Sequence, residues 1–387
     1  MMITLIPLIR SITLASITLM CAAHQSSAQI ERIWLTHRSN EPDKIVVNWQ
    51  TTAAGPSTVE FGSTDALGNQ VIVDDKTTLH HVEIPLKEGE AAHYRVSTGE
   101  QRSAVHRIKP YPKDELRVAV VANWQGRPKL DAIVKDDVHL LLTAGDNIPD
   151  LHNRCGVGVK DCVKPYSELI DTYPELFRST PFMPALGNHD REIRPRGEKP
   201  PAEPVYDVEA TAFRRFFPLP DEGWMWRFDI PRFDVRFIAL DLNHIQDQGT
   251  TWQTCHPFTK DSEQFKWYDK VSDRRDRRFV VTLHNEKSGH IRARENSQWH
   301  RMFSRGTCSI TGFGYFAERA EVGGFPYFNT SLSGRGARYA DSQSRFIESE
   351  NNYVLITLVR GGKMLRVEMK SLEGKVLDRS DWPAAKP

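Results

Sequence analysis

The stretch that decides the fold is Phe182-Met183-Pro184-Ala185-Leu186-Gly187-Asn188-His189-Asp190. It consists of a short apolar run, Phe182–Leu186, followed by Gly187 and then by three polar residues. A continuous apolar run of this length is typical of a strand buried on both faces. Polar residues at the carboxyl ends of such strands are where open α/β folds place their functional sites.

The same pattern recurs on both sides of this stretch. Several further apolar runs each end at a polar residue, and residues 166–177 between them have the apolar spacing of a helix. Buried strands interleaved with helices predict an α/β domain with a covered sheet. Residues 353–359 and 365–369 predict a closing antiparallel hairpin. The other runs are Val118–Ala122 before Asn123, Val138–Thr143 before Gly145-Asp146-Asn147, Val235–Leu240 before Asp241, and Phe279–Leu283 before His284.

Residues 30–110 have a different pattern, in which apolar residues alternate with polar ones and turn signals come about every ten residues. Ile45, Val47 and Trp49 show this alternation. Period-two patterning with frequent turns predicts a small β-sandwich. The Pro-containing segment Lys109–Glu115 is interpreted as the linker to the α/β domain.

The first 28 residues have the features of a secretory signal peptide. Arg10 precedes an apolar run from Ile12 to Ala23, and Ser26-Ser27-Ala28 resembles a cleavage site. The run is shorter than the roughly 20 apolar residues that a membrane span needs. We therefore expect a secreted or periplasmic protein, with an uncleaved anchor as the alternative.

The composition excludes some classes of partner. The chain has 387 residues with 51 Lys and Arg against 50 Asp and Glu, which gives no electrostatic case for nucleic acid or for an anionic membrane. After removal of the signal, an even number of cysteines remains, which permits two disulfides in an exported chain. The short spacing of the first two favours a pair between them, which leaves the other two as the second pair, and four free thiols are the alternative. The cysteines are Cys155 with Cys162, and Cys255 with Cys308.

Metal-ligand residue types stand at three of the predicted strand ends: Asp146, Asn188 and His284. A carboxylate, an amide oxygen and an imidazole suit Fe, Zn or Mn. The order of these residues, each after an apolar strand, predicts a metal site at one edge of the sheet.

The motifs Gly145-Asp146-Asn147, Gly187-Asn188-His189-Asp190 and Val281-Thr282-Leu283-His284 resemble consecutive motifs of calcineurin-like metallophosphoesterases, and of purple acid phosphatases in particular. The resemblance implies an α/β (α+β) metallophosphoesterase fold with two layered mixed β-sheets flanked by helices. It also implies a preceding fibronectin III-like sandwich. The domains would then be residues 29–110 and 114–387, and the activity would be hydrolysis of phosphate monoesters at a two-metal centre.

The resemblance also assigns a role to each matching residue. Asp146 would bridge the two metals, and Asn188 and His284 would bind the second one. His189 would contact the phosphoryl oxygens or protonate the leaving group, and Asp190 would orient the ring of His189.

The sequence departs from the family pattern at five positions. The metal-binding Asp of the first motif is Asn123, and the His that follows in many relatives is Gln125. The Tyr of purple acid phosphatases aligns with Pro149, and the two histidines of the last motif are Phe313 and Tyr315. One carboxylate cannot offset two adjacent multivalent cations. The residues therefore predict one divalent or ferric ion, Fe, Zn or Mn, rather than two.

Three hypotheses for the function follow. The first is a phosphate-monoester hydrolase with a one-metal site, acting on a phosphorylated small molecule. The second is an inactive pseudo-phosphatase that binds a ligand or a partner in the old cleft. The third is a scaffold acting through the sandwich. Other residues near the motifs either contribute to the site or lie in solvated loops: Asp150, His152, Glu286, His290, Arg191, Arg194 and Arg196.

Overall fold

The first of the two large sheets carries the strands that begin the phosphoesterase-like motifs. Its order is β19-β18-β17-β7-β8-β9, with β7, β8 and β9 parallel and the last three strands of the chain antiparallel beside β7. The predicted closing hairpin is β17–β18, and β19 extends it. In the described part of the chain its strands are β7 (Glu115–Val121), β8 (Leu140–Thr143), β9 (Phe182–Met183), β17 (Asn352–Val359), β18 (Met364–Ser371) and β19 (Val376–Pro383).

The second large sheet has the order β10-β11-β12-β13-β15-β14-β16. The strands from β11 to β13, and then β15, run parallel, and the edges are antiparallel. The two mixed sheets that the family resemblance implies are therefore present. The described strands of this sheet are β10 (Trp226–Ile230), β11 (Val235–Asn243), β12 (Phe279–Asn285), β13 (Cys308–Thr311), β14 (Ala317–Val322), β15 (Phe325–Asn329) and β16 (Ser344–Glu348).

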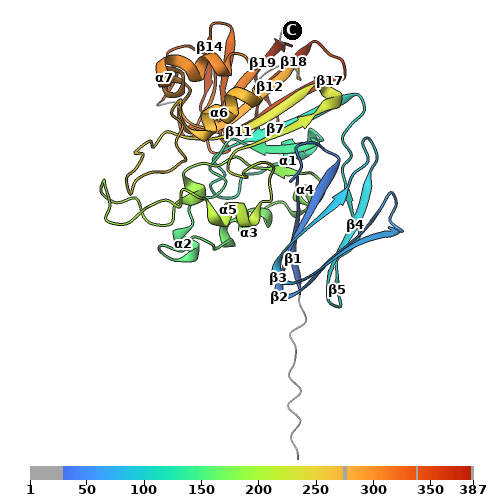
Figure 1. Ribbon diagram of the computed structural model, residues 1–387. Helices are drawn as coiled ribbons and strands as arrows, with labels where there is room; N and C mark the ends of the chain where they lie inside the picture. Colours follow the sequence, from blue (N-terminus) through green and yellow to red (C-terminus); the bar gives the residue numbers. More distant parts are fainter. Residues whose placement is uncertain (1–28, 273–276, 337–338, 385–387) are drawn as a thin grey trace, which may run out of the picture.

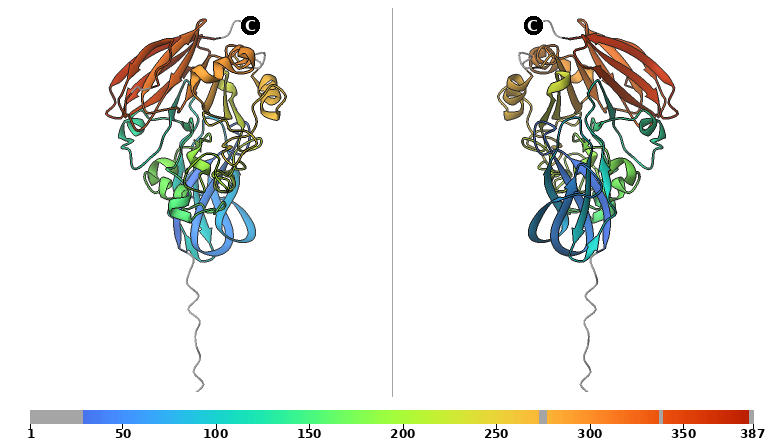
Figure 2. Two further views of the ribbon diagram at one scale, coloured as in Figure 1. Left: turned by 90° about the vertical axis from the view of Figure 1, so that its left-hand side faces the viewer. Right: turned by 90° about the vertical axis from the view of Figure 1, so that its right-hand side faces the viewer.

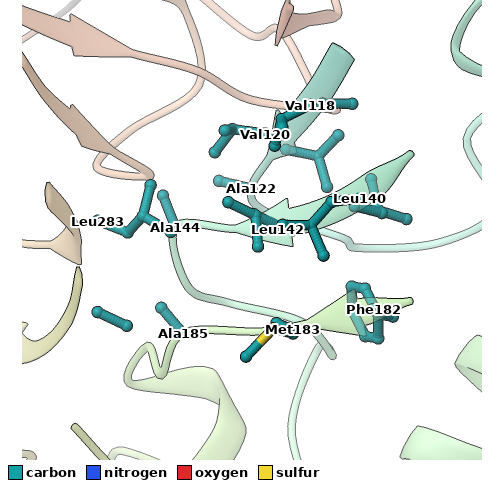
Figure 3. Close-up of a cluster of buried hydrophobic side chains, with 14 of the residues drawn as sticks. Val118, Val120, Ala122, Leu140, Leu142, Ala144, Phe182, Met183, Ala185 and Leu283 are labelled. Atoms are coloured by element: carbon teal, nitrogen blue, oxygen red, sulfur yellow. The ribbon is translucent and has the colours of Figure 1, made fainter. Parts of the chain in front are cut away.

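A shared hydrophobic core joins the inner faces of these two sheets. Figure 3 shows side chains of β7, β8 and β9, among them Val120 and Leu142, in one cluster with Leu283 of β12. The alternate residues of β11 and β12, such as Ile238 and Val280, belong to a second cluster with the side chains of two helices. Each central strand is thus buried on both faces, which explains the continuous apolar runs in the sequence.

The helices connect the strands, and α3 and α4 lie against β1 of the N-terminal sheet (Figures 1 and 2). The two longest, α6 and α7, pack on the outer face of the second sheet. Non-helical backbone interrupts α7 at residues 294–297. The described helices are α1 (Asp131–Lys135), α2 (His152–Cys155), α3 (Lys164–Ile170), α4 (Pro174–Phe177), α5 (Thr211–Phe216), α6 (Glu263–Val271) and α7 (Ser288–Phe303), with 3-10 turns η1 (His189–Arg191) and η2 (Pro231–Phe233).

The N-terminal strands form a third sheet with its own core, drawn in blue and cyan in Figure 1. The long strands β2 and β3 pair with each other, and β2 also pairs with β1 and β4. Trp34 of β1 stacks on Phe216 of α5 at 4.2 Å between ring centroids, which ties this sheet to the rest of the chain. The described strands are β1 (Ile30–Thr36), β2 (Lys44–Gly62), β3 (Asn69–Pro85), β4 (Ala92–Thr98), β5 (Gln101–Arg102) and β6 (His106–Ile108).

The computed structural model describes residues 29–272, 277–336 and 339–384. The predicted signal peptide, residues 1–28, lies outside the described residues. Within those ranges, none of the helices has the length and apolarity that crossing a bilayer requires.

The cysteines form one of the two predicted disulfides. Cys155 and Cys162 are bonded, whereas Cys255 and Cys308 are free and buried. The predicted Cys255–Cys308 pair is therefore wrong. The physical reason is their placement: Cys308 packs in the core between the large sheets, and Cys255 packs in the cluster under the helices.

Candidate functional site

The loops that follow β8 and β9 are joined by one buried carboxylate, Asp190. It accepts hydrogen bonds from the backbone N–H of Gly187 (2.8 Å) and from the backbone N–H and side-chain amide of Asn147 (3.1 and 3.0 Å). Burial, and then the charge of Asp146, raises the pKa of Asp190 to about 7. The described contacts of Asp190 thus join two loops, whereas the sequence predicted that it orients the ring of His189.

The glycine before Asn188 permits a close approach of these loops. A Cβ on Gly187 would lie 2.1 Å from Oδ1 of Asp146 and 2.3 Å from its backbone nitrogen. Asp146 itself has a φ of 57°, in the left-handed region, and its Oδ1 accepts a hydrogen bond from the backbone N–H of His189 at 3.2 Å. The two motifs therefore meet as the sequence predicted, because glycine leaves room for the Asp146 carboxylate.

A guanidinium group lies over the second of these motifs. Nδ1 of His189 donates to the carbonyl oxygen of Pro149 at 2.5 Å, so in the neutral ring Nε2 is free to accept from Nη2 of Arg196 at 3.1 Å. The Asn188 amide satisfies its neighbours when its oxygen accepts from the same Nη2, at 2.5 Å. Glu192 Oε2 holds the guanidinium from behind, at 2.9 and 2.8 Å. Arg196 thus contacts both Asn188 and His189.

The other half of the site is closed by hydrogen bonds among its own residues. The side-chain amide of Asn123 donates to the carbonyl oxygens of Gly312 and Gly314, both at 2.8 Å. Gln125 Nε2 lies 3.2 Å from the hydroxyl of Tyr315. Three of the five positions where the sequence departs from the family pattern therefore bond the loop after β7 to the loop after β13.

The structure places His284 away from the other predicted ligands. Its ring stacks on Phe303 of α7, at 5.4 Å between centroids. Nδ1 accepts from the backbone N–H of Glu286 at 3.1 Å, so Nε2 is the donor to Oγ of Ser309 at 2.9 Å. Burial lowers the pKa of His284 to about 3. Both ring nitrogens are bonded within the protein, on the face of the sheet that the helices cover.

Comparison with known proteins agrees with this architecture. A family model of calcineurin-like phosphoesterases matches residues 117–308. The chain carries a calcineurin-like phosphoesterase domain. The family is metal-dependent, so the fit of this chain's residues to a metal centre is the next question.

Two solved structures share the fold. One is purple acid phosphatase PPD1 from yellow lupin (Lupinus luteus) seeds, with 15% identity and a TM-score of 0.69 over 92% of this chain and 74% of that chain. The other is PhoD, with 13% identity and a TM-score of 0.61 over 90% of this chain and 88% of that chain. A search of curated proteins gave no match.

The phosphoesterase domain has a cavity of about 610 Å³ at these strand ends. Six of the ten positions that the family resemblance singles out line it, and Gln125, Pro149, Asp190 and His284 do not. The lining residues are Asn123, Asp146, Asn188, His189, Arg196, His244, Lys287, His290, Phe313, Gly314, Tyr315 and Tyr339.

The lining of this cavity carries more positive than negative charge. Arg196 and Lys287 are cationic, and Asp146 is the one carboxylate that lines it within the described ranges. Burial lowers the pKa of His244 to about 4, so this ring is neutral at neutral pH. Nδ1 of His290 lies 3.4 Å from the buried carboxylate of Glu286. The cavity is therefore suited to an anion.

The residues of the phosphoesterase domain do not fit the family's metal pair. No group of three or more His, Cys, Asp or Glu side chains is arranged to hold a metal ion anywhere in the described ranges. Asn123 presents N–H donors rather than a ligand oxygen to the loop after β13. His284 is turned to the opposite face, and Arg196 lies on the Asn188 oxygen. Beside Asn188, which the family resemblance assigns to metal binding, lies a different cation, the guanidinium of Arg196.

Some lining residues were missed by the sequence analysis. His244 follows β11, but that strand was predicted to end at Asp241, and Asp241 instead pairs with Arg191 at 2.6 Å. Lys287 and Tyr339 carried no signal, because neither belongs to a motif that resembles the family. Arg196 and His290 were named, each with a solvated loop as the alternative, and the structure brings both to the cavity.

Proposed function

We propose that this protein binds the phosphoryl group of a phosphoester in the cavity of its phosphoesterase domain, through cationic side chains rather than through a metal pair. The observation that carries the proposal is the guanidinium of Arg196 on Asn188 and His189. Arg presents several N–H donors in a planar fork that matches phosphate oxygens.

The charge of the cavity and the family support this proposal. Lys287 adds a second cation, and the ring of His189 adds a polar group at the same strand ends. The phosphoesterase family makes phosphoesters the expected ligand class. Hydrolysis of a monoester at a single metal, the first hypothesis from the sequence, needs Asp146, Asn188 and His284 to converge. The bonded ring of His284 favours the binding function instead.

Three further parts of the proposal rest on the sequence. We propose that residues 1–28 direct the chain to the periplasm or the exterior. We also propose that residues 29–110 form a fibronectin III-like module and residues 114–387 the phosphoesterase domain. A phosphorylated small molecule is the proposed ligand.

The experiment is isothermal titration of the mature protein with inorganic phosphate and with glycerol phosphate. Arg196→Gln should weaken binding of both at least tenfold, because charge-assisted bonds to the phosphoryl oxygens are lost. Arg194→Gln is the matched control: Arg194 is a neighbour in the same loop, faces Glu203 at 3.8 Å and does not line the cavity. It should change the affinity less than twofold.

The same samples test hydrolysis. Release of phosphate from glycerol phosphate is measured with Zn²⁺, Mn²⁺ or Fe³⁺ added, and none is expected. Turnover that is lost in His284→Ala would overturn the proposal in favour of the one-metal hydrolase. Equal phosphate affinity of wild type and Arg196→Gln would overturn the role of the guanidinium.

A further inference from the structure

The cavity has an aromatic wall as well as a cationic one. Phe313 follows β13, in the place of a metal-binding histidine of the family, and lines the cavity with Tyr315, Tyr339 and His244. The ring of Phe313 packs edge-to-face with His244 at 5.2 Å and with Tyr339 at 5.5 Å between centroids. These contacts make a continuous aromatic surface from His244 through Phe313 to Tyr339.

Tyr339 is the part of this aromatic surface that is exposed to solvent. It is 55% exposed, and it is the one aromatic residue among the exposed large hydrophobic side chains of the described ranges. Nζ of Lys287 lies 5.8 Å from its ring centroid, which places a cation beside the exposed ring. An exposed aromatic side chain at the edge of a cavity is typical of a surface on which a ligand ring stacks.

The aromatic and cationic walls come from different loops. Arg196 and His189 follow β9, whereas Phe313 and Tyr315 follow β13 and Tyr339 lies between β15 and β16. The cavity volume of about 610 Å³ falls in the range of small-molecule sites, roughly 300–1,000 Å³. It accommodates a phosphoryl group and one or two rings together.

We propose that the ligand is a phosphate ester of an aromatic group, either an aryl phosphate or a nucleotide. Its phosphoryl group binds at Arg196, and its ring lies against Phe313 and Tyr339. This inference rests on the proposed function, since it specifies what the phosphoryl group is attached to. Aromatic rings in place of metal-binding histidines have a role under this proposal, because they supply a stacking surface beside the anion site.

The test compares four ligands by isothermal titration on the mature protein: inorganic phosphate, glycerol phosphate, phenyl phosphate and adenosine monophosphate. Phenyl phosphate or adenosine monophosphate should bind at least tenfold more tightly than glycerol phosphate. The tighter of the two identifies the source of the ring.

Two substitutions at Tyr339 distinguish an effect of losing the aromatic ring from an effect on folding. Tyr339→Leu should reduce the preference for the aromatic esters over glycerol phosphate to about twofold or less. Tyr339→Phe is the matched control, and it should keep the preference because the ring is kept.

The outcomes distinguish this inference from the proposed function. Equal affinities for glycerol phosphate, phenyl phosphate and adenosine monophosphate, with inorganic phosphate still bound, would overturn the inference alone. A preference that persists in Tyr339→Leu would overturn the placement of the ring. Failure of all four ligands to bind would overturn the proposed function, and this inference with it.

Discussion

The loops in the two halves of the cavity are held in place by different kinds of contact. After β8 and β9, the backbone loops are held by the buried carboxylate of Asp190, and glycine leaves room for Asp146. After β7 and β13, Asn123 donates directly to the facing loop. The first half has the residue types that the family resemblance implies, and the second half lacks them.

The comparison separates residues that hold loops from residues that hold metals. Asp190 and Gly187 act on backbone atoms, so they are needed whether or not a metal binds. A carboxylate at residue 123 would face two carbonyl oxygens with no cation between them, and an amide donates to both instead. Side-chain hydrogen bonds therefore replace metal coordination in the second half.

The largest expected effect is a pH dependence of the free energy of unfolding, which comes from Asp190 in the loops after β8 and β9. Burial raises the pKa of Asp190 from 3.8 to about 7. Between these values the folded state keeps a proton that the unfolded state has released, so the stability from this group is full below pH 4 and falls as the pH rises to 7. The shift corresponds to about 4 kcal/mol.

The measurement is the free energy of unfolding by urea at several pH values from 4 to 7, for wild type and Asp190→Asn. The difference, wild type minus variant, should fall by up to about 4 kcal/mol as the pH rises. Asp65→Asn, in an exposed turn, controls for the removal of one carboxylate. A difference that stays constant over this range would contradict the prediction.

The next effect tests the close approach in the same half. Gly187→Ala places a methyl group 2.1 Å from Asp146 Oδ1, and relief of this overlap should cost about 3 kcal/mol of unfolding free energy. Gly289→Ala in α7, where the nearest atom would be 3.4 Å away, should be neutral or stabilising. Equal stability of the two variants would show that the loops can separate at no cost.

A smaller effect tests the second half. Asn123→Asp replaces two hydrogen bonds by repulsion between the carboxylate and two carbonyl oxygens, which should lower the free energy of unfolding at pH 7 by about 2 kcal/mol. The loss should shrink at pH 4, since a protonated carboxyl donates one hydrogen bond. Asn123→Ala, which removes the donor without adding charge, should lack this pH dependence. Wild-type stability of Asn123→Asp at pH 7 would mean that a cation replaces the amide.

The smallest effect is expected on treatment with a chelator. The described residues of the cavity do not fit a metal pair, and a metal ion stabilises the folded protein only if it binds there. EDTA should therefore change the melting temperature of the mature protein by less than about 1 °C. Differential scanning calorimetry measures this shift. A decrease of several degrees that added Zn²⁺ reverses would sink the assignment of the cavity to cationic side chains.

Much of the architecture was predictable because it depends on local pattern. Continuous apolar runs predicted the buried strands of an α/β domain, and the family resemblance implied that they form two mixed sheets. Glycine before Asp146 and Asn188 marked two tight strand ends that the structure brings together. The spacing of Cys155 and Cys162 indicated their disulfide. Each of these features involves residues close in sequence, or a burial pattern that repeats along the chain.

The sequence could not predict which face of β12 the side chain of His284 occupies, and the reason is physical. Alternation tells which face of a strand a side chain occupies, but a strand buried on both faces has no polar side to set the phase. Leu283 packs between the sheets, so His284 faces the helices, where Phe303 and Ser309 bind its ring. Only the packing of α7 decides this.

The sequence by itself determined the domain type, the apolar runs that form the central strands and the loss of the family's metal ligands, because these follow from residue identity and spacing. The tertiary structure decided which groups fill the cavity. It placed the guanidinium of Arg196 on Asn188, and it closed Asn123 against the loop after β13. Those contacts join residues far apart in the chain, and their formation depends on how two sheets and their loops pack.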